Sequence, residues 1–229
     1  MPTNTKSLKI RVNIDRTVSG LLDMPPKAVA CLVLAHGAGA GMTHAFMQAV
    51  AVELAERGIA TLRYQFAYME AGGKRPDPPK LAHTAVRAAV EAASHEAKGL
   101  SLFAGGKSFG GRMTSQAQGL SPLPGVKGLV FFGFPLHAAG KPSDERGAHL
   151  SDVKVPMLFL QGTRDALAEL DLLKPLVKSL GKRTTLELAE DADHSFHVPA
   201  RSGRKDPEVR VALLDLAAVW MKRIASSRP

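Results

Sequence analysis

The sequence predicts an α/β fold built on a doubly wound, mostly parallel sheet of about eight strands with helices on both faces. Short apolar runs alternate with amphipathic segments along most of the chain, which is typical of βαβ units. The composition, 45% hydrophobic and 22% charged residues, is ordinary for a globular protein. A length of 229 residues suits one domain over residues 1–229.

The expected strands are of two kinds. Residues 8–14 alternate apolar and polar side chains, which favours an edge strand in an antiparallel opening hairpin. Residues 28–35 are continuously apolar, as expected of a central strand covered on both faces. Further apolar runs predict strands at residues 59–66, 100–104, 126–134, 155–160 and 186–188.

The segments between these strands predict helices at residues 42–57, 77–98, 108–118 and 172–180, and a last one from residue 206. Gly58 is placed to end the first helix, and Asp77 and Pro78 to open the second as N-cap and first helical residue. Pro175 requires its helix to start late or to kink. The last helix has core residues at helical spacing, namely Val209, Leu213, Leu216, Trp220 and Ile224. Only about twenty residues separate the strands near 135 and 155, so no sizeable cap domain is expected.

Several function classes are disfavoured by composition. No apolar stretch follows Met1 as in a secretory signal, and no apolar run is long enough for a bilayer. The single cysteine, Cys31, lies in an apolar stretch, which suits a small core residue in a reducing cytoplasm. The net charge of +9 is scattered, and two Tyr and one Trp offer no base-stacking pattern. We therefore expect a cytoplasmic protein that binds neither membrane nor nucleic acid.

The sharpest motif is Gly106-Lys107-Ser108-Phe109-Gly110, which fits G-x-S-x-G between an expected strand and an expected helix. A sharp strand-to-helix turn would lift the Ser108 hydroxyl above the sheet edge as a nucleophile, and a glycine-rich turn without chemistry is the alternative. The same residues also resemble the end of a phosphate-binding loop. That interpretation fails because Ser101 stands where the loop needs glycine.

A serine nucleophile needs a histidine base and a carboxylate that orients the histidine. Asp165 follows the expected strand 155–160 and His194 follows the last expected strand, in the order Ser, Asp, His. Asp165 could instead cap the following helix, and His197 could replace His194 as base. Two further carboxylates, Asp191 and Asp193, are expected to shape the histidine loop.

Small residues at positions 36–41 follow the central strand and predict an oxyanion hole. One backbone N–H would come from Phe109, after the nucleophile, and the other from Ala38, with Gly39 as the near alternative. His36 is expected to brace this loop or to contact substrate. A flexible turn is the alternative for the glycines, but it does not explain why they coincide with the serine motif.

These segments resemble the α/β-hydrolase superfamily along nearly the whole chain. Residues 36–41, 105–112, 162–165 and 193–196 are most similar to small lidless members related to dienelactone hydrolases and to bacterial predicted hydrolases with HGAGAG and GGKSFGGR segments. The resemblance implies the triad and oxyanion roles above, hydrolysis of a small ester or thioester, and no metal or organic cofactor. Two departures are the serine, where dienelactone hydrolases use cysteine, and the charged Lys107 before it.

Other features of the site remain alternatives. Lys107 and Arg112 are expected to bind substrate, and together with Arg63 and Arg201 they would favour acidic substrates at the pocket mouth. The loops 67–79 and 135–150 are expected to build the pocket. A non-catalytic scaffold, an acyltransferase or a peptidase on the same fold stays open, as does a monomer or a homodimer.

Overall fold

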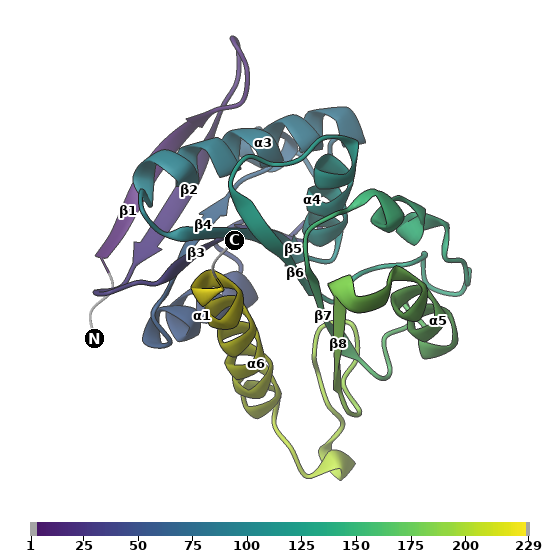
Figure 1. The fold of residues 1–229 in the computed structure, drawn as a ribbon. Helices are drawn as coiled ribbons and strands as arrows, with labels where there is room; N and C mark the ends of the chain where they lie inside the picture. Colours follow the sequence, from purple (N-terminus) through teal and green to yellow (C-terminus); the bar gives the residue numbers. More distant parts are fainter. Residues whose placement is uncertain (1–3, 228–229) are drawn as a thin grey trace.

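The computed structural model describes residues 4–227. Its strands are β1 (Asn4–Arg11), β2 (Thr17–Met24), β3 (Ala30–Ala35), β4 (Ile59–Tyr64), β5 (Ser101–Lys107), β6 (Val126–Phe132), β7 (Met157–Gly162) and β8 (Thr184–Ala189). They form one eight-stranded sheet in the order β1-β2-β4-β3-β5-β6-β7-β8 (Figure 1). The pairs β1–β2 and β2–β4 are antiparallel and all other pairs are parallel, so the expected opening hairpin and mostly parallel sheet are confirmed.

The helices are α1 (Ala45–Glu56), α2 (Ala67–Glu70), α3 (Pro79–Glu96), α4 (Phe109–Leu120), α5 (Leu170–Leu180) and α6 (Asp206–Ser226). Three 3-10 segments join them, η1 (Glu145–Asp152), η2 (Gly181–Arg183) and η3 (Ala200–Ser202). Apolar residues of α1 and α6 cover one face of the sheet, and those of α3, α4, α5 and η1 cover the other. Figure 1 shows these two layers. Helices on both faces and the lack of a large cap in the described residues agree with expectation.

Four details of the sequence-based prediction are wrong. The first strand ends at Arg11, and Ile14 is almost fully exposed between β1 and β2. Asp77 does not cap α3, because Pro78 holds the N-cap position and the Asp77 carboxylate accepts the Tyr68 N–H. The helix with Pro175 starts earlier than predicted, at Leu170. Leu216 is 42% exposed and not a core residue of α6.

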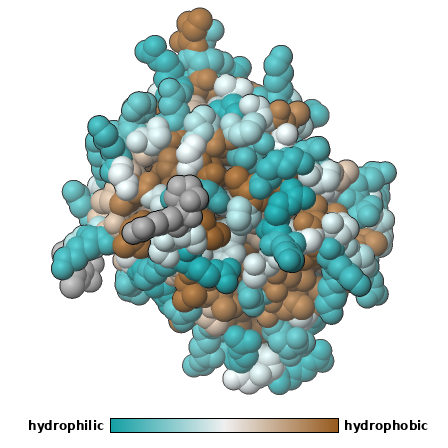
Figure 2. All heavy atoms as spheres, in the orientation of Figure 1, coloured by the Kyte–Doolittle hydropathy of each residue, from teal (hydrophilic) through white to brown (hydrophobic). Residues whose placement is uncertain are grey.

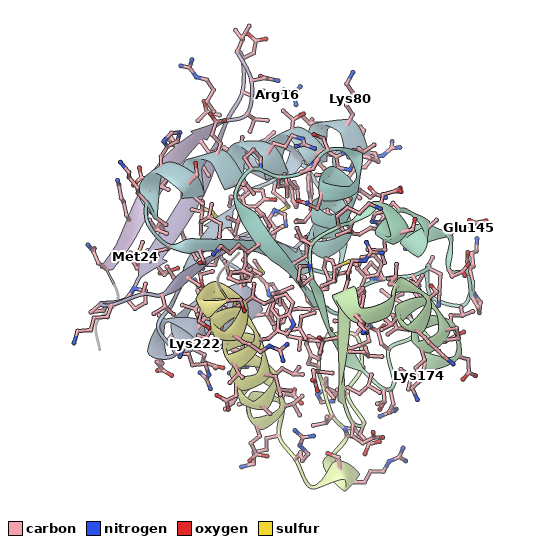
Figure 3. The ribbon with its side chains drawn as sticks, viewed as in Figure 1. Arg16, Met24, Lys80, Glu145, Lys174 and Lys222 are labelled. Atoms are coloured by element: carbon pink, nitrogen blue, oxygen red, sulfur yellow. The ribbon has the colours of Figure 1, made fainter. Side chains whose placement is uncertain are left out.

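The face of the molecule seen in Figure 2 carries both hydrophilic and hydrophobic residues. Figure 2 shows hydrophilic residues around the edge of this face and hydrophobic ones toward its middle. The charged side chains that Figure 3 labels come from different parts of the fold, namely Arg16 in the turn between β1 and β2, Lys80, Glu145, Lys174 and Lys222.

Gly105 is a position in β5 where a side chain has no room. A Cβ atom there would lie 1.8 Å from the Val130 carbonyl oxygen on β6, which is backbone and cannot move aside. We expect Gly105→Ala to lower the free energy of unfolding by about 4 kcal/mol or more, seen as a fall in Tm of about 10 °C. Gly37→Ala is the matched control, because its Cβ would meet nothing closer than 3.6 Å. Equal Tm values for the two variants would contradict this prediction.

Candidate active site

Ser108 lies at the sharp turn from β5 into α4, here called the elbow (residues 106–110). Its backbone angles, φ 50° and ψ −116°, are ones that non-glycine residues rarely adopt. Two glycines allow the turn to pack against β3. A Cβ on Gly106 would lie 2.4 Å from the Ala35 carbonyl oxygen, and one on Gly110 would lie 2.6 Å from the same oxygen. The G-x-S-x-G spacing is therefore a packing requirement that leaves the Ser108 side chain projecting from the sheet edge.

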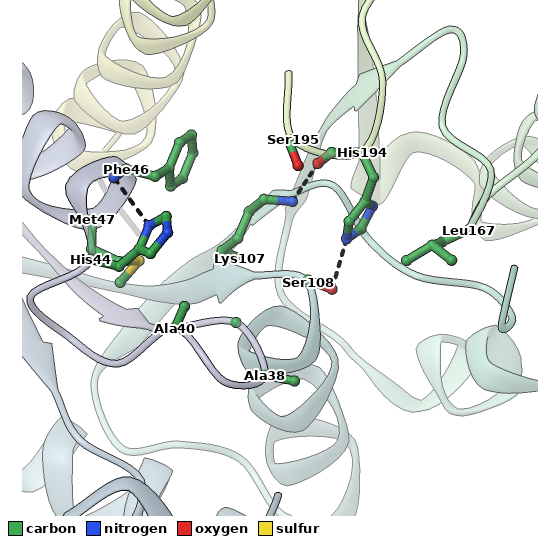
Figure 4. A pocket seen from close by; sticks show the side chains of 11 residues that line it. Ala38, Ala40, His44, Phe46, Met47, Lys107, Ser108, Leu167, His194 and Ser195 are labelled. Carbon is green, nitrogen blue, oxygen red and sulfur yellow. Dashed lines mark hydrogen bonds between the residues drawn. The ribbon is translucent and has the colours of Figure 1, made fainter. Parts of the chain in front are cut away.

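The three residues that the sequence singled out as a triad are brought together. His194 Nε2 lies 2.8 Å from Ser108 Oγ (Figure 4). On the other side of the ring, His194 Nδ1 lies 2.7 Å from Asp165 Oδ2. Asp165 is fully buried at its side chain, whereas the His194 side chain is 23% exposed. A carboxylate on Nδ1 favours the tautomer with a proton there, which leaves Nε2 free to accept the Ser108 hydroxyl proton.

Asp165 is oriented by neighbours other than His194. Its Oδ1 accepts the Leu167 N–H at 2.8 Å, and its Oδ2 accepts an N–H from the Gln161 amide. The Gln161 side chain is itself fixed, because its carbonyl oxygen accepts the Phe134 N–H. Helix α5 starts only at Leu170 with Glu169 at its N-cap, so Asp165 does not cap it. Gln161 was missed in the sequence, where a lone amide inside the apolar strand run was the available signal.

The loop that carries His194 is shaped by Asp193. One oxygen of this carboxylate accepts the N–H groups of both Ser195 and His197, as expected of a loop-forming residue. The rival base, His197, is exposed and pairs with Asp206 at 2.8 Å, away from Ser108. Hydrogen bonding and the charge of Asp206 raise the pKa of His197. The structure therefore brings His194, and not His197, to the serine.

The loop after β3 is braced by residues 65–68. The Gly39 N–H donates to the Tyr68 hydroxyl at 2.9 Å, and the Met42 N–H donates to the Gln65 side chain. His36 is fully buried; its Nδ1 lies 2.7 Å from the Gly37 carbonyl oxygen, and its Nε2 accepts the Phe66 N–H. Burial lowers the pKa of His36 to about 4, so its ring is neutral. His36 braces the loop and is not placed to contact substrate, which corrects that part of the prediction.

Within residues 4–227, the N–H groups of Ala38 and Phe109 donate to no protein acceptor. The N–H of Gly39, the alternative to Ala38, donates to the Tyr68 hydroxyl. Ser108 lies in Figure 4 with His194 on one side and the Ala38 loop on the other. Two free backbone donors near the serine are what an oxyanion needs. The sequence analysis did not identify Tyr68 as the acceptor of the Gly39 N–H, because no local pattern links two positions so far apart in the chain.

Lys107 points into the site beside Ser108. Its ammonium donates to the His194 carbonyl oxygen at 2.5 Å (Figure 4). It also lies 5.4 Å from the centre of the Phe196 ring. Burial lowers the pKa of Lys107 to about 8, against the opposite effect of Asp165 and Asp193. Gly133 makes room for it, because a Cβ there would lie 2.9 Å from the ammonium nitrogen. Lys107 therefore holds the histidine loop as well as lining the cavity.

Ser108 opens on a cavity of about 310 Å³. Its walls are mostly apolar and come from the loop after β3, the start of α1, the turn at Ser108, the loop after β7 and the loop that carries His194. The lining residues are Gly37, Ala38, Ala40, His44, Phe46, Met47, Lys107, Leu167 and Ser195 beside Ser108 and His194. None of these residues comes from the loops 67–79 and 135–150, which corrects that expectation. Loop 67–79 instead supports the Ala38 loop from behind through Tyr68.

Of the four basic residues expected at the pocket mouth, Lys107 alone is among the cavity-lining residues. Arg63 is buried and pairs with Asp23 at 2.9 Å while donating to the Met42 carbonyl oxygen. Arg201 lies in η3 and is exposed. Arg112 lies on α4 outside the cavity lining. The prediction that Arg63 lies at the pocket mouth is therefore wrong, because its side chain is buried in an ion pair with Asp23.

A second serine–histidine contact occurs on α4, where Ser115 Oγ lies 2.7 Å from His149 Nε2. Ser115 is fully buried, and its hydroxyl also donates to the Arg112 carbonyl oxygen. No carboxylate of the described residues hydrogen-bonds His149, and burial lowers the pKa of His149 to about 4. This pair lacks both substrate access and an orienting carboxylate, so it does not resemble a nucleophile and base.

No group of three or more His, Cys, Asp or Glu side chains within residues 4–227 is arranged to hold a metal ion. Across the same residues, no helix has the length and the apolar character that crossing a membrane requires.

Cys31 is buried in β3, where burial raises the pKa of its thiol to about 12. It is a core residue, as expected.

The sheet order, the elbow and the Ser–His–Asp hydrogen bonds define an α/β-hydrolase fold with a serine at its nucleophile position. The model of the alpha/beta hydrolase domain family matches residues 28–222, and the chain belongs to that family. The expected superfamily resemblance is thereby confirmed.

Several solved structures are similar to the chain in fold but share little sequence with it. A dienelactone hydrolase from Anabaena variabilis is 21% identical, with 96% of this chain and 98% of that chain covered and a TM-score of 0.77. A lidless serine hydrolase from Xanthomonas campestris is 22% identical, with 100% and 99% covered and a TM-score of 0.74. A puromycin-hydrolysing peptidase from Mycobacterium tuberculosis is 16% identical, with 99% of this chain but 41% of that chain covered and a TM-score of 0.73. At these identities the likeness shows the fold alone.

Proposed function

We propose that this protein is a serine hydrolase that cleaves a small carboxylic ester or thioester through an acyl-enzyme on Ser108. The observation that carries the proposal is the unbroken hydrogen-bond chain from Ser108 through His194 to Asp165, beside a cavity with mostly apolar walls. The walls offer no free carboxylate among the lining residues, and the Lys107 ammonium is engaged by the His194 carbonyl oxygen. An uncharged acyl group fits these surroundings best.

The residues would act in two half-reactions. His194 Nε2 takes the Ser108 proton as Oγ attacks the carbonyl carbon, and the oxyanion is held by the Ala38 and Phe109 N–H groups. The imidazolium, stabilised by Asp165, then protonates the leaving alcohol or thiol, which departs and leaves the acyl-enzyme. In the second half-reaction, His194 takes a proton from water, which attacks the acyl carbon. Return of that proton to Ser108 Oγ releases the acid.

Two other functions remain candidates. Peptide hydrolysis is one candidate, because a peptidase has a similar fold. Acyl transfer is the other, because it would use the same residues. A non-catalytic scaffold is disfavoured, because the hydrogen-bonded triad and the two free backbone donors have no evident structural need. A cytoplasmic location, a monomer or homodimer, the absence of a cofactor and one domain over residues 1–229 stay predictions; residues 1–3 and 228–229 lie outside the described part.

The testing experiment combines a fluorophosphonate probe with turnover of p-nitrophenyl acetate, an acetyl thioester and a p-nitroanilide. We expect labelling of the folded protein and turnover of the ester and thioester. Preferential turnover of the anilide would favour a peptidase instead. Folded protein that is neither labelled nor active on any of the three substrates would overturn the proposal in favour of a scaffold.

Lys107 predicts a pH dependence of this activity. Above its pKa of about 8 the ammonium loses its proton, and its charge-assisted bond to the His194 carbonyl oxygen weakens. Activity should therefore fall as the pH rises through about 8, whereas Lys107→Met should have a roughly tenfold lower kcat without that alkaline limb. The measurement is kcat between about pH 6 and pH 10 for wild type, Lys107→Met and Lys107→Arg. An unchanged alkaline limb in Lys107→Met would show that another group causes it.

A further inference from the structure

One face of α4 carries Arg112, Ser115 and Gln116, which are three and four residues apart and so lie side by side. This face meets two other elements. His83 Nε2 of α3 lies 3.2 Å from the Gln116 side-chain oxygen, and His149 Nε2 of η1 lies 2.7 Å from Ser115 Oγ. Figure 1 shows α4 between α3 and the segment that follows β6. Side chains from three separate segments therefore converge around Arg112.

Arg112 is unsatisfied in this position. Within the described residues its guanidinium donates no hydrogen bond and forms no ion pair, and its Nε is buried without a partner. Arg146 of η1 likewise has no ion pair or side-chain hydrogen bond in residues 4–227. A half-buried guanidinium without acceptors costs free energy, because its lost hydration is not replaced.

The surroundings add positive charge and little negative charge. Burial, and secondarily the charge of Arg146, lowers the pKa of Arg112. Burial lowers the pKa of His149 to about 4, with further lowering by Arg112 and His83, while Asp152 acts in the opposite direction. The lowered pKa values of Arg112 and His149 mean that the protonated, positively charged form of each group is disfavoured at this place.

The remaining charged neighbours do not compensate. Burial, and to a smaller extent the charges of Arg87 and Arg112, lowers the pKa of His83 against the opposite effect of the Gln116 hydrogen bond. Arg87 of α3 already donates to the carbonyl oxygens of Ala117 and Ser121. Glu145, next to Arg146, is exposed and projects outward in Figure 3. Asp152 is therefore the one carboxylate that acts on His149 from the described residues. An added anion would supply the missing acceptors and balance the charge.

We propose that Arg112, Arg146, His83 and His149, here called the Arg112 cluster, bind a phosphate group. Guanidinium groups match phosphate oxygens with paired donors. Each imidazole uses Nε2 inside the protein and has Nδ1 without a partner in the described residues, and Nδ1 donates to a phosphate oxygen when the ring is protonated. The cluster shares no residue with the cavity at Ser108. The phosphate site is thus a second site, independent of the proposed hydrolase activity.

A bound phosphate would also change the titration of the cluster. A dianion stabilises the protonated imidazole, so the pKa of His149 should rise from about 4 when phosphate binds. A general salt effect without a specific site would not move His149 alone.

The test is calorimetric titration with inorganic phosphate and with phenyl phosphate at constant ionic strength, combined with NMR of the histidine ring protons. We expect saturable binding, a raised pKa of His149, and binding weakened about tenfold in Arg112→Met. Arg146→Met is the second variant, useful if Arg112→Met fails to fold. Arg223→Met, an exposed arginine on α6 at the other sheet face, is the matched control and should bind normally.

The outcomes separate the sources of the phosphate group. Tighter binding of phenyl phosphate indicates an organic phosphate, and equal or weaker binding indicates the free ion. Absence of saturable binding for both ligands, or binding equal in Arg112→Met, Arg146→Met and Arg223→Met, would overturn the proposal. Since binding requires no catalysis, an inactive hydrolase could still bind phosphate, and an active one could fail to.

Discussion

Ser108→Ala should abolish turnover, with kcat reduced on the order of 10⁵-fold, and should remove fluorophosphonate labelling. The reason is that the acyl-enzyme forms only on Oγ, and no other hydroxyl lies against His194 Nε2 in the hydrogen bonds of the described residues. The variant should fold, because a methyl side chain fits the space of the hydroxymethyl group and Ser108 makes no side-chain cap bond to α4. The measurement is burst and steady-state release of p-nitrophenol, with Tm as the folding check.

Ser115→Ala is the matched control for this result. Ser115 lies on the same helix and also contacts a histidine, but it is fully buried and its histidine has no orienting carboxylate. We expect Ser115→Ala to keep labelling and most of the activity. The reverse pattern, with activity lost in Ser115→Ala and kept in Ser108→Ala, would refute the assignment of the nucleophile.

Asp165→Asn should lower kcat on the order of 10⁴-fold with little loss of folded protein. The carboxylate accepts from two donors at Oδ2, the His194 Nδ1–H and the Gln161 amide. An asparagine that turns its NH₂ toward His194 favours the tautomer with a proton on Nε2, which can no longer take the Ser108 proton. An asparagine that keeps its oxygen there retains the tautomer but loses the negative charge that stabilises the imidazolium. Both orientations lower kcat.

Asp193→Asn tests whether any nearby carboxylate would serve. Asp193 is next to His194 in sequence, but its oxygen accepts two backbone N–H groups, and an asparagine oxygen can accept them as well. We expect less than about a tenfold change in kcat for this variant. A large loss in Asp193→Asn with little change in Asp165→Asn would mean that the orienting carboxylate has been misassigned. Measuring kcat and KM separately for both variants distinguishes orientation of His194 from substrate binding.

The sheet, the turn at Ser108 and the chain order of Ser108, Asp165 and His194 could be predicted from local patterns in the sequence. Strands buried on both faces, such as β3, have to be continuously apolar, so they are visible as runs. Gly106 and Gly110 are required by backbone approach at Ala35, so the elbow is readable as a motif. Element ends were less predictable, because Ile14 and Leu216 are apolar yet exposed, and apolar residues on a surface carry no penalty large enough to forbid them.

Which candidate residues lie at the site and which support it could be seen only in the folded chain. The Gly39 N–H is not free, because it donates to the Tyr68 hydroxyl. The buried His36 accepts the Phe66 N–H, and Arg63 forms an ion pair with Asp23. The fold likewise separates Arg112 from the cavity and gives Lys107 the His194 carbonyl oxygen. The physical reason is that hydrogen-bond and charge satisfaction depend on partners distant in sequence. Periodicity and motif spacing report on local backbone and burial, and they contain no information about which distant group accepts a given proton.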